Sequence, residues 1–206
     1  MQSGIFPTNT FTEDAALRAM FEARKRVFVD LLKWDVPVLA DMYEIDQFDT
    51  IDAAYLVLAD DCGKHRASTR LLRTDRPHIL ADLFPGLCAS EVPSGPSIRE
   101  ITRFCLEPTL SSVERRKVRN QLVTALVEYA LRSGITDYTG VAYVSWFDQV
   151  VAFGWDCRAL GPPCVIGCDR LVALHIRIDA DTPAALAAAG IYSSPTSRLT
   201  AAGGLQ

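Results

Sequence analysis

The chain has 206 residues, a formal charge of −4 at pH 7 and 49% hydrophobic residues, which is ordinary for one globular α/β domain. Its pI near 5.4 argues against nucleic acid as the main partner, because phosphate binding needs a basic face. No secretory signal pattern opens the chain and no window approaches about 18 uninterrupted apolar residues. We therefore expect a cytoplasmic protein without a membrane partner, with a single domain over residues 1–192.

The cysteines and histidines do not indicate a metal site. Six cysteines form no CxxC pair, and the chain has three histidines, so a zinc site is not expected. Cys164 and Cys168 are the closest pair, and we interpret them as ordinary thiols near a strand. We expect reduced cysteines that serve as packing residues.

The N-terminal part predicts a helix followed by a loop. Apolar residues recur every three or four positions over residues 12–32, the pattern of an amphipathic helix. Thr12 and Asp14 suit its start as a cap and as an acid at the positive end of the helix dipole. Residues 33–50 contain Pro37 and scattered acids without a period, which predicts a long ordered loop.

Strand patterns follow. Two apolar runs, 54–59 and 67–73, flank a polar connection with a glycine and predict a β-hairpin. A short helix is expected over 79–84. Residues 97–106 alternate between two faces, which predicts a strand with Glu100 among apolar neighbours and Arg103 on the opposite side of the pleat.

A capping box, Ser111 with Glu114, opens a long helix that runs to residue 132 and is closed by Gly134. The elements expected after it are a strand over 138–144, a short helix capped by Ser145 and ending near Gly154, one or two strands over 164–178, and a helix begun at Asp181 or Thr182 with Pro183 in its first turn. Residues 193–206 are predicted to be a flexible tail. This order favours an α/β fold with one central mixed sheet covered by helices, in which the strands before and after the long helix are parallel.

Arg24, Phe28 and Trp34 form the first candidate cluster, at the exit of the first helix. One cation and two aromatic rings can hold a flat or cationic ligand by stacking and cation–π attraction. In the structural alternative, the two rings are core and Arg24 makes a surface ion pair.

The loop acids Glu44, Asp46 and Asp49 form the second cluster. Carboxylates in a loop can bind a metal, a ligand amine or a sulfonium, or can simply solvate the loop. The glycine and the alternate acidic positions of a calcium loop are missing.

Arg70, Glu100 and Arg103 form the third cluster, in the middle of apolar strands. Charges there are costly to bury unless they are paired. An arginine–glutamate pair explains two of them and leaves the third without a structural reason.

Eight positions of these clusters, in order between residues 24 and 103, together resemble the set that marks the LuxI-type acyl-homoserine lactone synthases. The short sequence motifs around these positions are also similar: "ExDxxD" in the loop, "SxRLLxTxxPxxL" at the hairpin, "ExTRF" in the next strand, and a later "FGW" before "LGPP". The resemblance covers roughly residues 15–175.

The resemblance implies a three-layer α/β/α fold similar to the GCN5-related N-acetyltransferases. It also implies an acyltransferase that makes a quorum-sensing autoinducer from S-adenosylmethionine and an acyl thioester. In that family the amine of S-adenosylmethionine attacks the thioester, and the methionyl carboxylate then closes on its own γ-carbon and expels methylthioadenosine. S-adenosylmethionine is a substrate, and no cofactor is expected.

The resemblance also implies roles for individual residues. Glu100 is the expected general base, and burial would raise its pKa toward useful basicity. The other catalytic candidates are Arg70 and Arg103, and the candidates for binding S-adenosylmethionine are Arg24, Phe28, Trp34, Asp46 and Asp49. The arginines either hold the methionyl carboxylate or clamp the acids, and the acids either recognise the amine or sulfonium or orient the loop.

One departure from related acetyltransferases concerns the acyl donor. The long helix opens without their glycine-rich pyrophosphate loop. Its first turns carry a basic run instead, made of Arg115, Arg116, Lys117 and Arg119, which can dock an acidic acyl carrier protein or be a solvated helix face. A coenzyme A donor stays open. The acyl pocket is expected to be lined by Leu122, Leu126, Val141 and Tyr143.

Two alternatives differ in function. One is an N-acyltransferase of the same fold that acts on another amine, which would give an acylated product without a lactone. The other is a degenerate, non-catalytic ligand-binding regulator, which predicts that Glu100→Gln changes nothing measurable.

Overall fold

The computed structural model describes residues 12–194 and 198–203. Its centre is an eight-stranded sheet with the order β10-β3-β4-β5-β6-β9-β7, and β8 pairs with β9 beside it. The strands are β3 (Ala54–Ala59), β4 (His65–Arg73), β5 (Ile98–Leu106), β6 (Asp137–Tyr143), β7 (Asp156–Ala159), β8 (Cys164–Ile166), β9 (Asp169–Arg177) and β10 (Arg198–Gly203). A separate pair, β1 (Val38–Leu39) and β2 (Tyr43–Glu44), lies in the N-terminal loop.

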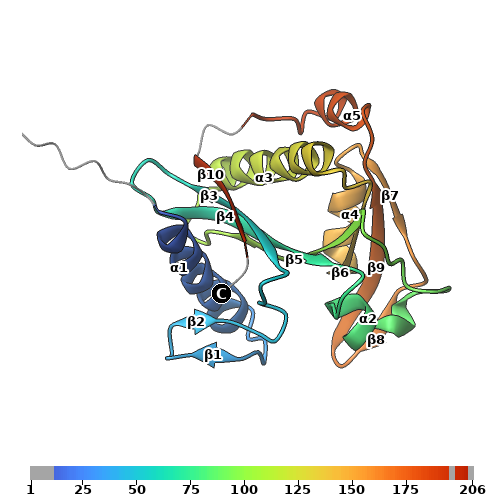
Figure 1. Cartoon of the computed structure of the whole chain (residues 1–206), viewed down its shortest axis with the longest axis horizontal. Helices are drawn as coiled ribbons and strands as arrows, with labels where there is room; N and C mark the ends of the chain where they lie inside the picture. Colours follow the sequence, from blue (N-terminus) through green and yellow to red (C-terminus); the bar gives the residue numbers. More distant parts are fainter. Residues whose placement is uncertain (1–11, 195–197, 204–206) are drawn as a thin grey trace, which may run out of the picture.

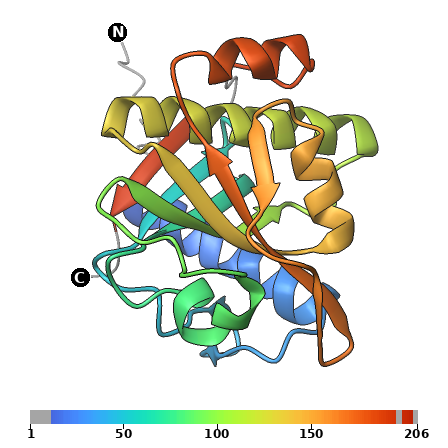
Figure 2. The ribbon, with the colours of Figure 1, turned by 90° about the vertical axis from the view of Figure 1, so that its right-hand side faces the viewer.

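Helices cover both faces of the sheet, as Figures 1 and 2 show. One face packs against α1 (Glu13–Arg24), the π-helix η1 (Lys25–Leu31), α2 (Ile79–Leu83) and the short η2 (Pro85–Leu87). The other face packs against α3 (Ser112–Ser133), α4 (Val144–Val151) and α5 (Thr182–Ala188), which together enclose the largest apolar core. The predicted three-layer α/β/α architecture with a mixed sheet is therefore confirmed.

The β5–α3–β6 unit sets the geometry of the molecule. The capping box of Ser111 with Glu114 is formed, and Gly134 ends α3 in the left-handed region at φ 67°. The helix returns the chain so that β5 and β6 are parallel, as expected. Their pairing covers only three register pairs, from Ile98–Asp137 to Glu100–Thr139. Beyond Glu100 the two strands diverge.

Several local predictions need correction. The first helix is not α-helical throughout, because the chain continues after Arg24 as a π-helix. The N-cap of α4 is Tyr143 without a side-chain hydrogen bond, and not Ser145. Strand β7 was not predicted, because its burial pattern is mostly exposed and offers no apolar alternation.

The predicted flexible tail is wrong for residues 198–203. They form β10, which pairs antiparallel with all six residues of β3. The backbone hydrogen bonds of a ladder do not require an apolar sequence, so small residues such as those of β10 give no strand signal. The rest of that prediction falls in part on residues 195–197 and 204–206, outside the described residues.

Gly154 provides a test of the packing between α4 and α5. It has φ 94°, and a Cβ placed on it would lie 2.7 Å from Ala189 Cβ and 2.9 Å from the Ala185 carbonyl oxygen. We expect Gly154→Ala to lower the free energy of unfolding by about 2 kcal/mol, because strain and a backbone clash add. Urea unfolding measures this. The matched control is Gly86→Ala, whose Cβ would meet nothing within 4 Å; equal stabilities of the two variants would contradict the expectation.

Candidate active site

A β-bulge in β5 places Arg103. The register with β4 shifts between Ser68 and Arg70, and Arg103 has φ 51°, in the left-handed region that a non-glycine residue seldom adopts. The bulge turns the Arg103 side chain to the face on which Arg70 and its register partner Thr102 lie. The prediction that Arg103 lies on the opposite side of the pleat from Glu100 is therefore wrong, because alternation fails at a bulge.

Arg24, at the end of α1, binds two acids of the N-terminal loop. Its Nη1 and Nη2 donate to Asp49 Oδ1 and Oδ2, each at 2.8 Å, and its Nε donates to Glu44. The side chains of all three residues are at most 1% exposed. Tyr55 of β3 donates its hydroxyl proton to Asp49 Oδ1 at 2.8 Å. These contacts fasten the loop to α1 and to the sheet.

Asp46 joins the two arginines of the sheet. Arg70 Nη1 donates to Asp46 Oδ1 at 2.6 Å, and Arg103 Nη2 donates to Asp46 Oδ2 at 2.7 Å. Arg103 Nη2 also donates to Glu44 Oε1 at 2.9 Å, and Arg70 Nη1 lies 2.8 Å from Asp49 Oδ1. Three guanidiniums and three carboxylates thus form one network, which we call the charge cluster: Arg24, Arg70, Arg103, Glu44, Asp46 and Asp49.

The charge cluster bears on two alternatives left by the sequence. Each acid is bound by guanidiniums, as expected if Asp46 and Asp49 orient the loop and the arginines clamp the acids. The pairing with Arg24 and Arg70 outweighs burial and lowers the pKa of Asp49 below its usual range. Arg103 is the most exposed of the three arginines, with 9% of its side chain accessible against 1% for Arg24 and 0% for Arg70.

Phe28 and Trp34 form an aromatic wall beside the charge cluster. Trp34 N donates to the Phe28 carbonyl at 2.8 Å, which folds the chain back after η1. Their rings stack at 4.7 Å between centroids, and the Arg103 guanidinium lies 5.5 Å from the centroid of each ring. Trp34 Nε1 also donates to the hydroxyl of Tyr143 at 2.9 Å. The wall therefore reaches from the N-terminal segment to the end of β6.

Glu100 is buried and lies outside the charge cluster. Its Oε1 accepts a hydrogen bond from the backbone N–H of Leu80 in α2 at 3.1 Å, and its Oε2 has no partner among the described residues. Burial raises the pKa of this carboxyl from 4.5 to about 7, although the backbone N–H of Leu80 and the charge of Arg70 lower it. The residue lies at the last register pair before β5 and β6 diverge. A carboxyl with these properties suits a general base near neutral pH.

The four residues predicted for the acyl pocket do not share one cavity. Leu122 and Leu126 belong to the core between α3 and the sheet. Val141 packs with Leu80 and other residues on the opposite face of the sheet. Tyr143 lies at the end of β6 against Trp34.

The basic run lies on the first turns of α3. Arg115, Arg116 and Lys117 are exposed. Arg119 is half-buried, its guanidinium lies 4.9 Å from the centroid of the Phe153 ring, and it donates to Asn120 Oδ1. Arg119 therefore has a packing role, and the other three residues remain accessible.

Two residues that contact the site, Glu44 and Tyr55, were assigned no functional role from the sequence. Glu44 was seen as one of three loop acids, but nothing in the sequence showed that it bridges Arg24 and Arg103. Tyr55 stands in an apolar strand run, where it looks like a core residue. Its hydroxyl partner, Asp49, becomes evident only from the fold.

Three further observations concern metal ligands, thiols and membrane spans. Within residues 12–194 and 198–203, no group of three or more histidines, cysteines or acids could hold a metal ion. All six cysteines are free thiols. In the same described ranges, no helix has the length and apolar character needed to cross a membrane.

The chain is similar to known proteins over most of its length. The model of a protein family described as autoinducer synthase matches residues 8–186. The chain belongs to the autoinducer synthase family. An acyl-homoserine-lactone synthase of Ralstonia nicotianae is 31% identical over 187 residues, which are 88% of this chain and 92% of that protein.

Solved structures of this family have the same fold. The crystal structure of TofI in a ternary complex with an inhibitor and MTA is 31% identical, with a TM-score of 0.72 over 91% of this chain and 94% of that one. The structure of BjaI, a CoA-dependent acyl-homoserine lactone synthase, with SAM and isopentyl-CoA is 25% identical, with a TM-score of 0.77 over 91% and 87% of the two chains. A putative N-acetyltransferase from Lactobacillus plantarum, 18% identical over 78% of this chain and 90% of that one, shares the fold with a TM-score of 0.55. The predicted likeness to acetyltransferases is confirmed at the level of the fold.

The charge cluster predicts a large effect for Asp49→Asn. The change leaves the guanidinium of Arg24 and one donor of Arg70 buried without their carboxylate, so we expect the free energy of unfolding at pH 7 to fall by about 3–5 kcal/mol. Because the folded pKa of Asp49 is lowered, the stabilisation is present above the unfolded value of about 4 and is lost as pH falls through the folded pKa. The difference between wild type and variant must therefore shrink on acidification below pH 4.

Urea unfolding from pH 7 to pH 3 measures this difference. The control is Asp75→Asn, because Asp75 pairs with Arg73 at 2.7 Å on the surface and such pairs contribute about 1 kcal/mol or less. A pH-independent difference for Asp49→Asn would contradict the role of its carboxylate.

Proposed function

We propose that the protein is an acyl-homoserine-lactone synthase that joins an acyl thioester to S-adenosylmethionine and releases methylthioadenosine and the thiol. The observation that carries this proposal is the combination of an aromatic and arginine wall with a buried carboxyl of raised pKa at the point where β5 and β6 part. Family membership supports the reaction. S-adenosylmethionine acts as a substrate, and no cofactor takes part.

The wall formed by Phe28, Trp34 and Arg103 is the proposed binding site for S-adenosylmethionine. The two rings offer a surface for the adenosyl part and for the sulfonium, through stacking and cation–π attraction. Arg103 is the one arginine of the charge cluster with appreciable exposure, so it is our candidate to bind the methionyl carboxylate. Arg24 and Arg70 then act as positioning residues, because they hold the acids of the N-terminal loop in place beside Arg103.

Glu100 is the proposed general base for acyl transfer. Its Oε2 takes a proton from the ammonium of S-adenosylmethionine, and the free amine attacks the thioester carbonyl. Backbone N–H groups of β5 beyond the last register pair are proposed to stabilise the oxyanion. The carbon–sulfur bond then breaks, the thiolate leaves with a proton, and an amide remains.

Lactone formation follows on the same bound molecule. A carboxylate oxygen of the methionyl part attacks its own γ-carbon, and the bond between this carbon and the sulfonium sulfur breaks. Methylthioadenosine leaves as a neutral thioether, so no base is required in this step. The protein contributes orientation: Arg103 and the aromatic wall hold the chain in the folded conformation that the ring closure needs.

Val141 and Tyr143 are the proposed acyl-facing residues, because they lie on β6 beyond its pairing with β5. Leu122 and Leu126 support them indirectly, by fixing α3 on the sheet. The cytoplasm is the proposed compartment, and the six free thiols support a reducing environment.

Glu100→Gln tests the proposed base. We expect the rate of lactone formation to fall by about 10²–10⁴-fold, and the wild-type rate to rise with pH through about 7, since the base acts when deprotonated. Because burial raises the pKa of Glu100, its ionisation destabilises the fold as pH rises from 4.5 to 7. The glutamine variant should therefore be at least as stable as wild type at pH 8.

The assay follows methylthioadenosine and lactone by mass spectrometry, with a panel of carrier-protein and coenzyme A thioesters. An acylated product without a lactone would indicate an amine N-acyltransferase instead. Unchanged activity of Glu100→Gln would refute the assignment of the base.

The exposed part of the basic run, Arg115, Arg116 and Lys117, is the proposed docking surface for an acyl carrier protein. Because α3 is the next element after β5, the start of α3 lies near the C-terminal end of β5, where β5 and β6 no longer pair.

We expect Arg116→Glu to raise the KM for an acyl carrier protein donor by about tenfold and to weaken the salt dependence of that KM. Kinetics with an acyl-coenzyme A donor should change little. Arg132→Glu, an exposed arginine in the last turn of α3, is the control; equal effects of both variants would contradict a docking surface.

A further inference from the structure

A row of polar residues crosses the sheet from Glu100 to the far strand. Glu100 of β5 is the register partner of Thr139 in β6, Thr139 is the partner of His175 in β9, and His175 is the partner of Arg158 in β7. Register partners in a sheet direct their side chains to the same face. On one side the next row of this face is apolar, with Val141 beside Ala173. On the other side it is charged, with Asp137 beside Arg177, so the polar row lies at the border of the apolar part of this face.

Two residues of this row that are register partners each have a buried oxygen without a partner. Glu100 Oε2 and Thr139 Oγ1 are inaccessible to solvent and make no hydrogen bond among the described residues. Both residues are 0% exposed. A buried polar atom without a partner costs free energy, so its presence calls for a functional explanation. Valine would fill the position of Thr139 with the same shape and without this cost.

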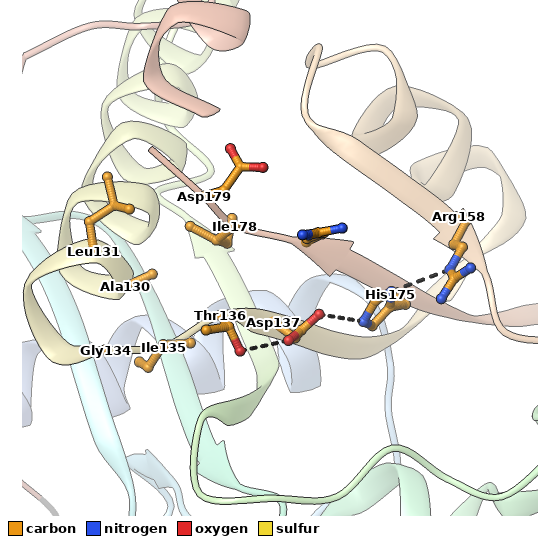
Figure 3. Close-up of a pocket in the computed structure, with 11 residues that line it drawn as sticks. Ala130, Leu131, Gly134, Ile135, Thr136, Asp137, Arg158, His175, Ile178 and Asp179 are labelled. Carbon is orange, nitrogen blue, oxygen red and sulfur yellow. Dashed lines mark hydrogen bonds and ion pairs between the residues drawn. The ribbon is translucent and has the colours of Figure 1, made fainter. Parts of the chain in front are cut away.

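The row ends at a cavity that opens to solvent (Figure 3). The cavity has a volume of about 680 Å³ and is lined by His175, Asp137 and Arg158 among others. His175 Nε2 lies 2.8 Å from Asp137 Oδ1, and its Nδ1 accepts from Arg158 Nε in a long contact of 3.4 Å. The His175 side chain is 14% exposed. His175 can thus exchange protons with water in the cavity, remote from the aromatic wall at the other end of β6.

The proposed reaction produces a proton that must leave the buried carboxyl. The substrate amine enters as an ammonium and ends as an amide; of the two protons that it loses, one goes out with the thiol and one must reach solvent. Glu100 holds that second proton after acyl transfer, and it must release the proton before the next turnover.

We propose that Thr139 and His175 form the route by which Glu100 releases its proton to the cavity at the start of β6, the end of this strand that is remote from the aromatic wall. The proton passes from Glu100 Oε2 to Thr139 Oγ1, whose own hydroxyl proton moves on to His175 Nδ1. Each transfer takes place after rotation of a side chain or through one bridging water. The imidazolium, paired with Asp137, then gives its Nδ1 proton to water. The inference rests on the proposed function, and the two relay residues act through Glu100 without touching substrate.

Charged groups lie at both ends of the row. The charges that act on Glu100 are those of Arg70 and Asp82. His175 faces Asp137 from β6 and Arg158 from β7, and Arg177, two residues further along β9, lines the same cavity.

Thr139→Val tests the route, because it removes the hydroxyl and keeps the shape of the side chain. At pH 8 Glu100 begins deprotonated, so we expect the first turnover to occur at the wild-type rate. Steady-state kcat should fall by about tenfold, with an unchanged KM for S-adenosylmethionine and a larger solvent deuterium isotope effect. The experiment is a rapid-quench measurement of methylthioadenosine, in which a burst of one equivalent followed by a slow phase is the expected signature.

Three further variants complete the experiment. Thr139→Ser should restore the steady-state rate, and His175→Gln should show the same burst as Thr139→Val. Thr124→Val, at another fully buried threonine whose hydroxyl accepts only from Ser193 N in the described structure, should show neither a burst nor a lowered kcat.

The outcomes separate the inference from the function on which it rests. If wild type forms no lactone with any donor, the proposed function fails. If wild type is active and Thr139→Val has a wild-type kcat, or is slowed equally in the first and later turnovers, the proton route is wrong.

Discussion

Burial of the charge cluster is the constraint on which the rest of the site depends. Six charged groups that balance to zero lie almost wholly out of water, where each is tolerated because the others satisfy its hydrogen bonds. The acids come from a loop with little regular structure, and the arginines come from α1, β4 and β5. The loop can adopt its path only while all three elements are in place, so the shape of the site is coupled to the whole N-terminal half of the fold.

The electrostatic separation of Glu100 from this cluster is equally important. Register keeps Glu100 out of the charge cluster, since Glu100 pairs with Leu72 while Arg70 pairs with Thr102, two residues further along the strands. A direct ion pair with Arg70 would lower the pKa of Glu100, as it does for Asp49. The protein thus contains two carboxyls, Asp49 and Glu100, that both interact with the charge of Arg70 and whose pKa values shift in opposite directions, which is a common arrangement in active sites.

The sequence predicts the architecture well because its strongest signals are local. The capping box at Ser111, the period of α3 and the hairpin at β3 and β4 all depend on neighbouring residues. The site residues were found through their resemblance to a family, and their geometry was beyond reach for two reasons. The bulge at Arg103 inverts the alternation on which a strand prediction rests, and the pairing of Glu44 with Arg24 and Arg103 depends on a loop without a period. Strand β10 escaped prediction because small residues give no pattern.

Strand β10 also has a consequence for the behaviour of the protein in solution. By pairing along the whole length of β3, it satisfies a row of backbone groups that would otherwise form an open sheet edge. An open edge next to apolar residues is a template for pairing between molecules. The last residue of β10 is held to the start of α1 by the bond from Gly203 N to Glu13 Oε1, at 3.0 Å. A tag or fusion that displaces this strand would therefore promote aggregation while leaving every residue of the active site intact.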